Sequence, residues 1–102
     1  MTAAPYYSLE TDSLGVLRLR GAISFANAAQ AYASPPQAPK RSGALEIDLA
    51  ALESADSATL AVLIAWSAAA RRGATALRFL RAPQGLCNLA KLAEVDGLLG
   101  LA

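Results

Sequence analysis

The short segment Asp56-Ser57-Ala58-Thr59 combines one carboxylate with two hydroxyl side chains. The segment directly precedes an apolar run with helical spacing, so its polar groups are predicted to lie at a helix N-terminus. Free N–H groups and the helix dipole favour negative charge there. Asp56 or Ser57 can cap the helix, whereas a phosphate on Ser57 or Thr59 would change the local charge by about two units. Taken alone, the pattern favours plain capping, with phosphorylation as the alternative.

The other candidates for chemistry point away from catalysis. The chain has no histidine, which removes the commonest general base and metal ligand, and it has no glycine-rich phosphate loop. Glu46 and Asp48 alternate along a predicted strand, and we expect a solvated face there rather than an acid–base pair. Cys87 is predicted to be a small buried hydrophobe. An enzyme is therefore the least favoured hypothesis, and we expect no cofactor and no metal.

Composition and charge narrow the class of protein further. The 102 residues suffice for a single domain, predicted to span residues 1–102, and 55% of them are hydrophobic. The net charge of +1 and the absence of a basic cluster with interleaved aromatic residues argue against nucleic-acid binding. The most apolar stretch, residues 58–70, is too short for a membrane span, and the N-terminus does not resemble a signal peptide. We expect a soluble, cytoplasmic protein.

Hydrophobic periodicity predicts a small α/β layer with the element order β-β-α-β-α-β-α. Strands are predicted at residues 6–10, 14–20, 44–49 and 76–80, and helices at residues 26–32, from residue 57 to 72, and from Pro83 to about residue 96. Pro35-Pro36 must end the first helix. The second helix has a wide apolar arc that includes Val62 and Trp66. Trp66 fits the core and a partner surface equally well.

These features together resemble a STAS domain. The strand at 44–49, Asp56-Ser57-Ala58-Thr59-Leu60 and an apolar helix ending in Arg71-Arg72-Gly73 carry the resemblance. Anti-sigma-factor antagonists of this family have Asp-Ser-Ser-Gly-Leu here, and their phosphorylated serine falls on Ser57. The similarity is greater to the MlaB group, which has Asp-Thr-Gly-Gly-Leu-Ala here and Thr-Leu-Ala-Lys-Leu where this chain has Asn88-Leu89-Ala90-Lys91-Leu92. The chain departs from both at Ala58-Thr59 and in the proline-rich segment 34–39.

The resemblance implies a mixed four- to five-stranded sheet with helices mainly on one face. It implies a non-enzymatic STAS subunit that binds and regulates the ABC ATPase (MlaF-like) of an Mla-type phospholipid transporter maintaining outer-membrane lipid asymmetry. Through that ATPase the protein would be peripheral to an inner-membrane permease complex. The expected partner-binding residues are Asp56, Ser57, Ala58 and Thr59, with Val62 and Trp66 as apolar anchors. The alternative is an anti-sigma-factor antagonist regulated by phosphorylation of Ser57.

Overall fold

A computed structural model describes residues 6–12, 16–36, 44–73 and 75–100. In this part of the chain the elements are β1 (Tyr7–Thr11), β2 (Leu17–Gly21), α1 (Phe25–Ala33), β3 (Ala44–Asp48), α2 (Ser57–Arg72), β4 (Ala76–Leu80), α3 (Gln84–Leu92) and α4 (Asp96–Leu99). The element order predicted from the sequence is confirmed, and α4 is added to it. Positions 14–15 of the second predicted strand and positions 37–39 of the proline-rich segment lie outside the described residues.

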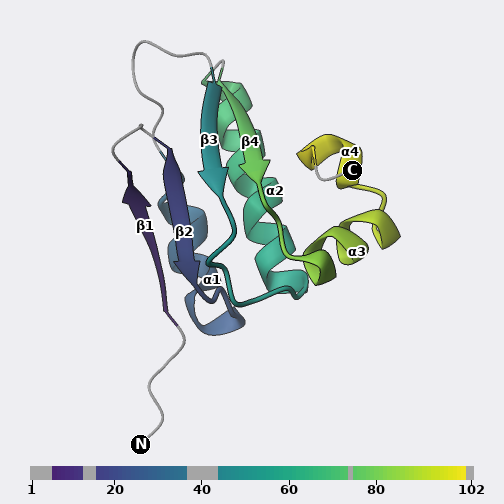
Figure 1. Ribbon diagram of the computed structural model, residues 1–102. Coiled ribbons are helices and arrows are strands. Elements are labelled where there is room, and N and C mark those ends of the chain that lie inside the picture. Colours follow the sequence, from purple (N-terminus) through teal and green to yellow (C-terminus); the bar gives the residue numbers. More distant parts are fainter. Residues whose placement is uncertain (1–5, 13–15, 37–43, 74, 101–102) are drawn as a thin grey trace, which may run out of the picture.

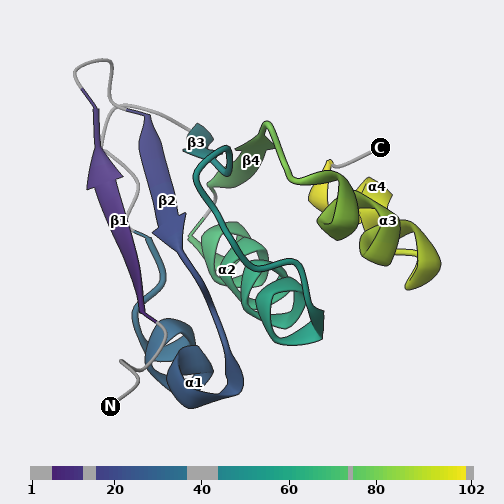
Figure 2. The same ribbon diagram turned by 60° about the horizontal axis from the view of Figure 1, so that its bottom comes forward.

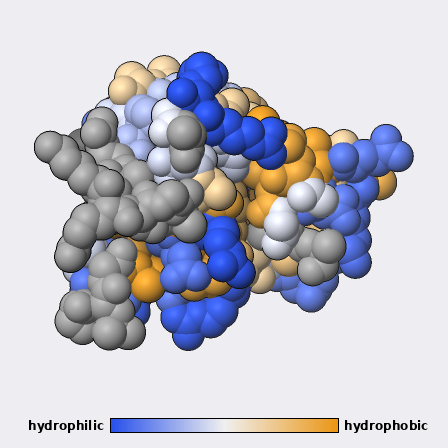
Figure 3. Space-filling view, turned by 90° about the horizontal axis from the view of Figure 1, so that it is seen from above, coloured by the Kyte–Doolittle hydropathy of each residue, from blue (hydrophilic) through white to orange (hydrophobic). Residues whose placement is uncertain are grey.

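The described strands form one mixed four-stranded sheet with the order β1-β2-β3-β4. β1 pairs with β2 in the antiparallel sense, and β2, β3 and β4 are parallel to one another. Helices α1 and α2 cover one face of the sheet, whereas α3 and α4 lie beyond β4 (Figures 1 and 2). This arrangement confirms the predicted fold class. Seen from above, Figure 3 shows hydrophobic surface bordered by hydrophilic side chains on the side of α3 and α4.

Trp66 is a core residue at the centre of α2. It is 1% exposed, its indole N–H donates to the carbonyl of Ala31 at 2.8 Å, and its ring lies 6.3 Å from that of Tyr7. Val62, one turn earlier on the helix, is 0% exposed. The alternation along β3 supplies the opposing layer, because Leu45, Ile47 and Leu49 all face the helices and are buried. The interpretation of Val62 and Trp66 as apolar anchors for a partner is therefore wrong, since neither side chain reaches the surface.

An ion pair joins the ends of β3 and β4 on the other face of the sheet. The Asp48 side chain is 4% exposed and accepts two hydrogen bonds from the guanidinium of Arg81, while Arg18 Nε lies 4.0 Å from its carboxylate. The Arg81 hydrogen bonds lower the pKa of the Asp48 carboxyl, helped by the N–H of Ala50 and the charge of Arg18 and opposed by burial. The predicted solvated face is therefore wrong for Asp48, because a cation 33 residues further along the chain closes over it.

Helix boundaries follow local chemistry except near the C-terminus. Ser24 and Asn27 form a capping box at the start of α1, and Ser34 ends that helix before the proline pair. The last predicted helix is shorter than expected, because α3 ends at Leu92 and Glu94 adopts the left-handed region at φ 61°. The predicted stop near residue 96 is instead the start of α4, whose Leu99 is 2% exposed. α4 thus folds back and places Leu99 against the core.

Candidate functional site

Three loops meet where the parallel strands β2, β3 and β4 end, at the lower end of the molecule in Figure 1. The N–H of Ile23 donates to Ser54 Oγ at 3.0 Å, and the N–H of Glu53 donates to the carbonyl of Gly21 at 2.7 Å. These bonds join the loop after β2 to the loop after β3. A β-carbon on Gly85 would lie 3.4 Å from Ala55 Cβ, so the start of α3 is close as well. Ligand sites in open α/β sheets form at this edge.

Gly21 lets the chain leave β2 in the direction of this site. Its φ of +88° lies in the left-handed region, which an L-residue rarely adopts. A β-carbon at this position would also overlap the carbonyl oxygen of Tyr6. The turn that carries Ile23 next to Ser54 therefore requires glycine.

Asp56 is the residue that caps α2. Its Oδ1 accepts the N–H of Thr59 at 2.9 Å and also lies 2.9 Å from the hydroxyl of Thr59. Its extended backbone, with φ −117° and ψ −178°, is that of an N-cap residue. The sequence allowed either Asp56 or Ser57 to be the N-cap, and in the structure the cap is Asp56. Ser57 consequently occupies the first helical position, with an exposed side chain.

The hydroxyl of Thr59 is part of a buried network. Thr59 is 0% exposed, and its Oγ1 lies 2.7 Å from Ser54 Oγ and 3.3 Å from the carbonyl of Ile23. The Thr59 hydroxyl has one proton to donate, to Asp56 or to the carbonyl of Ile23, and it can accept the proton of the Ser54 hydroxyl. The network ties the start of α2 to both preceding loops. Thr59 is therefore a structural residue, and the accessible hydroxyl of this pair belongs to Ser57.

The predicted partner-binding residues divide into two groups. Asp56 and Ser57 are exposed at the helix start. The other four are buried and offer no contact surface: Ala58, Thr59, Val62 and Trp66. That the exposed pair binds a partner stays a prediction.

Phe25 is the residue that sequence reasoning missed. It begins α1, directly after the loop that is bonded to Ser54 and Thr59, and it is 85% exposed. A signal was present, because a phenylalanine follows the N-cap Ser24 out of phase with the buried positions Asn27 and Ala31. An exposed aromatic side chain is a typical anchor in protein interfaces.

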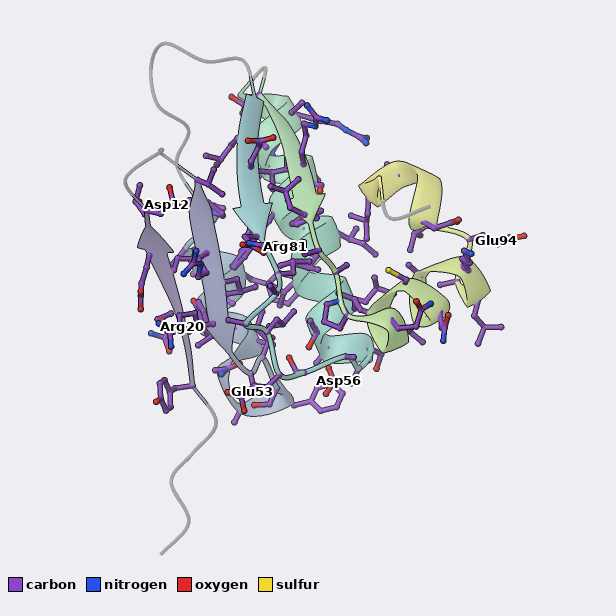
Figure 4. All side chains as sticks on the ribbon, viewed as in Figure 1. Asp12, Arg20, Glu53, Asp56, Arg81 and Glu94 are labelled. Atoms are coloured by element: carbon purple, nitrogen blue, oxygen red, sulfur yellow. The ribbon has the colours of Figure 1, made fainter. Side chains whose placement is uncertain are left out.

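The exposed side chains Phe25, Glu53, Asp56 and Ser57 are here called the docking surface. Figure 4 shows Glu53 and Asp56 at the lower end of the molecule, with Arg81 higher up. Both carboxylates are exposed, and no lysine or arginine occurs in residues 22–25, 53–57 or 83–85. The docking surface is therefore aromatic, hydroxylated and acidic. In the described part of the chain, no group of three His, Cys, Asp or Glu side chains is placed to hold a metal ion.

Comparison with known protein families agrees with this geometry. The family model described as "Mlab, STAS domain" matches residues 9–100. The chain therefore belongs to this family of STAS domains and is a STAS-type regulatory protein. No curated protein matches the chain. None of the described helices combines the length and the apolar character that a bilayer crossing needs.

Proposed function

We propose that this protein is a non-enzymatic STAS subunit that binds and regulates the ABC ATPase (MlaF-like) of an Mla-type phospholipid transporter. The observation that carries the proposal is the exposed hydroxyl of Ser57 on a surface whose underlying frame is fixed by hydrogen bonds. Membership in the family described as "Mlab, STAS domain" supports the choice of partner. The subunit would act at the cytoplasmic side of the inner membrane, reaching the permease through the ATPase.

The frame beneath the docking surface favours binding without rearrangement. Thr59 and Ser54 hold the helix start and the loop after β2 in one arrangement, so little conformational freedom is lost when a partner arrives. Phe25 supplies the apolar contact, and burying such a side chain contributes about 1.5–3 kcal/mol. The carboxylates of Glu53 and Asp56 favour a basic partner surface and raise the association rate at low salt.

The test is co-purification of Ser57→Glu with an MlaF-like ATPase from the same organism. We expect the ATPase to be lost from the complex, because a larger, charged side chain replaces the small hydroxyl at a contact that excludes water, where an unpaired carboxylate is costly to bury. Ala68→Glu adds the same charge to an exposed position of the same helix and should co-purify at the wild-type yield. Circular dichroism of both variants checks that the fold survives. Wild-type yield of the Ser57→Glu complex would refute the proposed role.

The accessibility of Ser57 also supports a second candidate function, an anti-sigma-factor antagonist. A kinase can reach its hydroxyl, and a phosphate there would sit at the N-terminus of the 16-residue helix α2. Ala58 does not reproduce the serine that follows the phosphoserine in such antagonists, and its burial at 5% exposure leaves little room for a larger side chain. Intact-mass measurement after incubation with ATP and an anti-sigma-factor serine kinase from the same organism separates the candidates. Phosphate on Ser57 would favour the anti-sigma-factor antagonist. An unmodified chain would favour the transporter subunit.

A further inference from the structure

A groove of about 660 Å³ lies between β4 and α4, remote from the docking surface. Residues 75–80 form one wall, which includes the full length of β4, and residues 97–100 form the other. Leu77 and Phe79 belong to the first wall and Leu98 to the second. Hydrophobic surface is visible on this side of the molecule in Figure 3. The volume lies within the usual range for ligand-binding clefts. We call this feature the β4–α4 groove.

The backbone of β4 presents unpaired hydrogen-bonding groups to this groove. β4 is an edge strand of the described sheet, with β3 on its other side. The carbonyl of Leu80 accepts the N–H of Leu49 at 2.8 Å, so Leu80 faces β3. Because backbone groups alternate along a parallel strand, those of Leu77 and Phe79 point outward. No described residue pairs with them, and such an edge is a template for another strand.

The charges of the β4–α4 groove are of one sign. Its charged lining residues are Arg71 and Arg78, both exposed, and its lining contains no acidic residue. Arg71 Nη2 lies 3.5 Å from the carbonyl of Leu98, so this guanidinium links α2 to α4. Arg78 projects from β4 to the side of the sheet that α1 and α2 leave open. The groove therefore combines an open strand edge, apolar side chains on both walls and two cations.

We propose that the β4–α4 groove binds an extended acidic segment of a partner protein, which adds to β4 as a further strand. The segment would pair with the outward N–H and C=O groups of Leu77 and Phe79. Alternate side chains would then point toward Leu98 and α2, where apolar residues fit, and toward Arg78, where carboxylates fit. The proposal concerns a second surface and does not depend on the partner that binds the docking surface.

The test uses a blocked eight-residue peptide of alternating valine and glutamate, with binding followed by NMR of the full chain. We expect the amide signals of Leu77 and Phe79 to shift more than those of β1. A peptide with lysine in place of glutamate should bind at least about tenfold more weakly, because its cations would face Arg78 in a groove whose lining has no acidic residue. The valine–glutamate peptide methylated at alternate backbone nitrogens should also bind at least about tenfold more weakly, because it lacks the N–H donors that strand addition needs.

Two matched variants place the binding in the groove. Arg71→Glu should weaken binding by about tenfold or more, which corresponds to about 1.4 kcal/mol. Arg72→Glu makes the same charge change one position further along α2 but outside the groove lining, and it should change affinity by no more than about twofold at physiological salt. Ser57→Glu should have no effect, which keeps this test separate from that of the docking surface.

Several outcomes would overturn the proposal. Equal losses in Arg71→Glu and Arg72→Glu would mean nonspecific attraction by charge. Undiminished binding of the methylated peptide would mean that no strand is added. Concentration-dependent shifts of Leu77 and Phe79 without peptide would identify a second copy of this chain as the occupant. Absence of any shift at millimolar peptide would show that the groove takes no acidic strand.

Discussion

The two ends of α2 are built from opposite chemistry. At the N-terminal end, Asp56 and Thr59 form a hydrogen-bonded network that fixes the backbone, and the exposed charges are acidic. At the C-terminal end, Arg71 and Arg72 are exposed cations beside a groove. The charges at both ends complement the helix dipole. Hydrogen bonds fix the N-terminal end, whereas the cations at the C-terminal end are exposed to solvent. A protein can thus offer two unlike surfaces from one rigid helix.

The largest expected effect concerns the apolar centre that holds both ends in place. Trp66→Ala should lower the free energy of unfolding by about 3–5 kcal/mol, because a fully buried ring is replaced by a cavity. Phe25→Ala should change it by no more than about 0.5 kcal/mol, because that ring is exposed. Urea unfolding measures both values. If the alanine variant does not fold, Trp66→Phe provides a milder substitution. Equal losses of stability at positions 25 and 66 would contradict the conclusion that Trp66 is a core residue and Phe25 a surface residue.

The next effect tests the locked N-terminal end. Thr59→Val preserves shape but removes the hydroxyl that is hydrogen-bonded to Ser54, Asp56 and Ile23, and it should cost about 1–3 kcal/mol. For a domain of this size each 1 kcal/mol lowers the melting temperature by about 4–8 °C. Ser57→Ala, two residues earlier, should leave the melting temperature nearly unchanged, because its side chain is exposed. A reversed order of the two melting temperatures would show that Ser57, and not Thr59, stabilises the helix start.

A third prediction concerns the strand ends that lead toward this helix start. Asp48→Asn should lower the free energy of unfolding by about 1–2 kcal/mol at neutral pH. This value is small for hydrogen bonds between charged groups, because Arg81 is largely exposed and water screens the pair. The pKa of Asp48 is lowered in the folded state, so its contribution is present above the unfolded value of about 3.9 and is lost as pH falls through the folded value. Unfolding curves of wild type and variant should therefore differ at pH 7 and converge below pH 4. A difference that is constant with pH would exclude the ion pair as its source.

The smallest effect tests the solvated C-terminal end. Arg71→Ala should lower the free energy of unfolding by about 0.3–1 kcal/mol at low ionic strength, because a cation is removed from the last turn of α2. At 1 M salt most of this difference should disappear, since the screening length falls to about 3 Å. The cap variant Asp56→Ala should retain its loss in high salt, because it removes a hydrogen bond to a backbone N–H. Thermal unfolding at two salt concentrations distinguishes the two ends.

Local patterns in the sequence were sufficient to predict most elements. The alternation at residues 44–49 and 76–80 predicted β3 and β4, and α2 begins after Asp56 and ends before Gly73 as expected. Caps, turns and strand alternation arise from groups within a few residues of one another, so they can be read from a single stretch of chain. The prediction of one long helix at the end failed, because the docking of Leu99 on a distant core favoured a break at Glu94.

By itself, the sequence determined the family resemblance, the element order and the position of Ser57 at a helix start. Only the tertiary structure decided which of the neighbouring side chains reach solvent. Thr59 and Trp66 are buried and hydrogen-bonded to the carbonyls of Ile23 and Ala31, which lie 36 and 35 residues earlier. Phe25, on the same helix as Ala31, is exposed. Burial depends on elements far apart in the chain, whereas the periodicity of a helix only says which residues share a face. The docking surface is therefore a property of the packed fold.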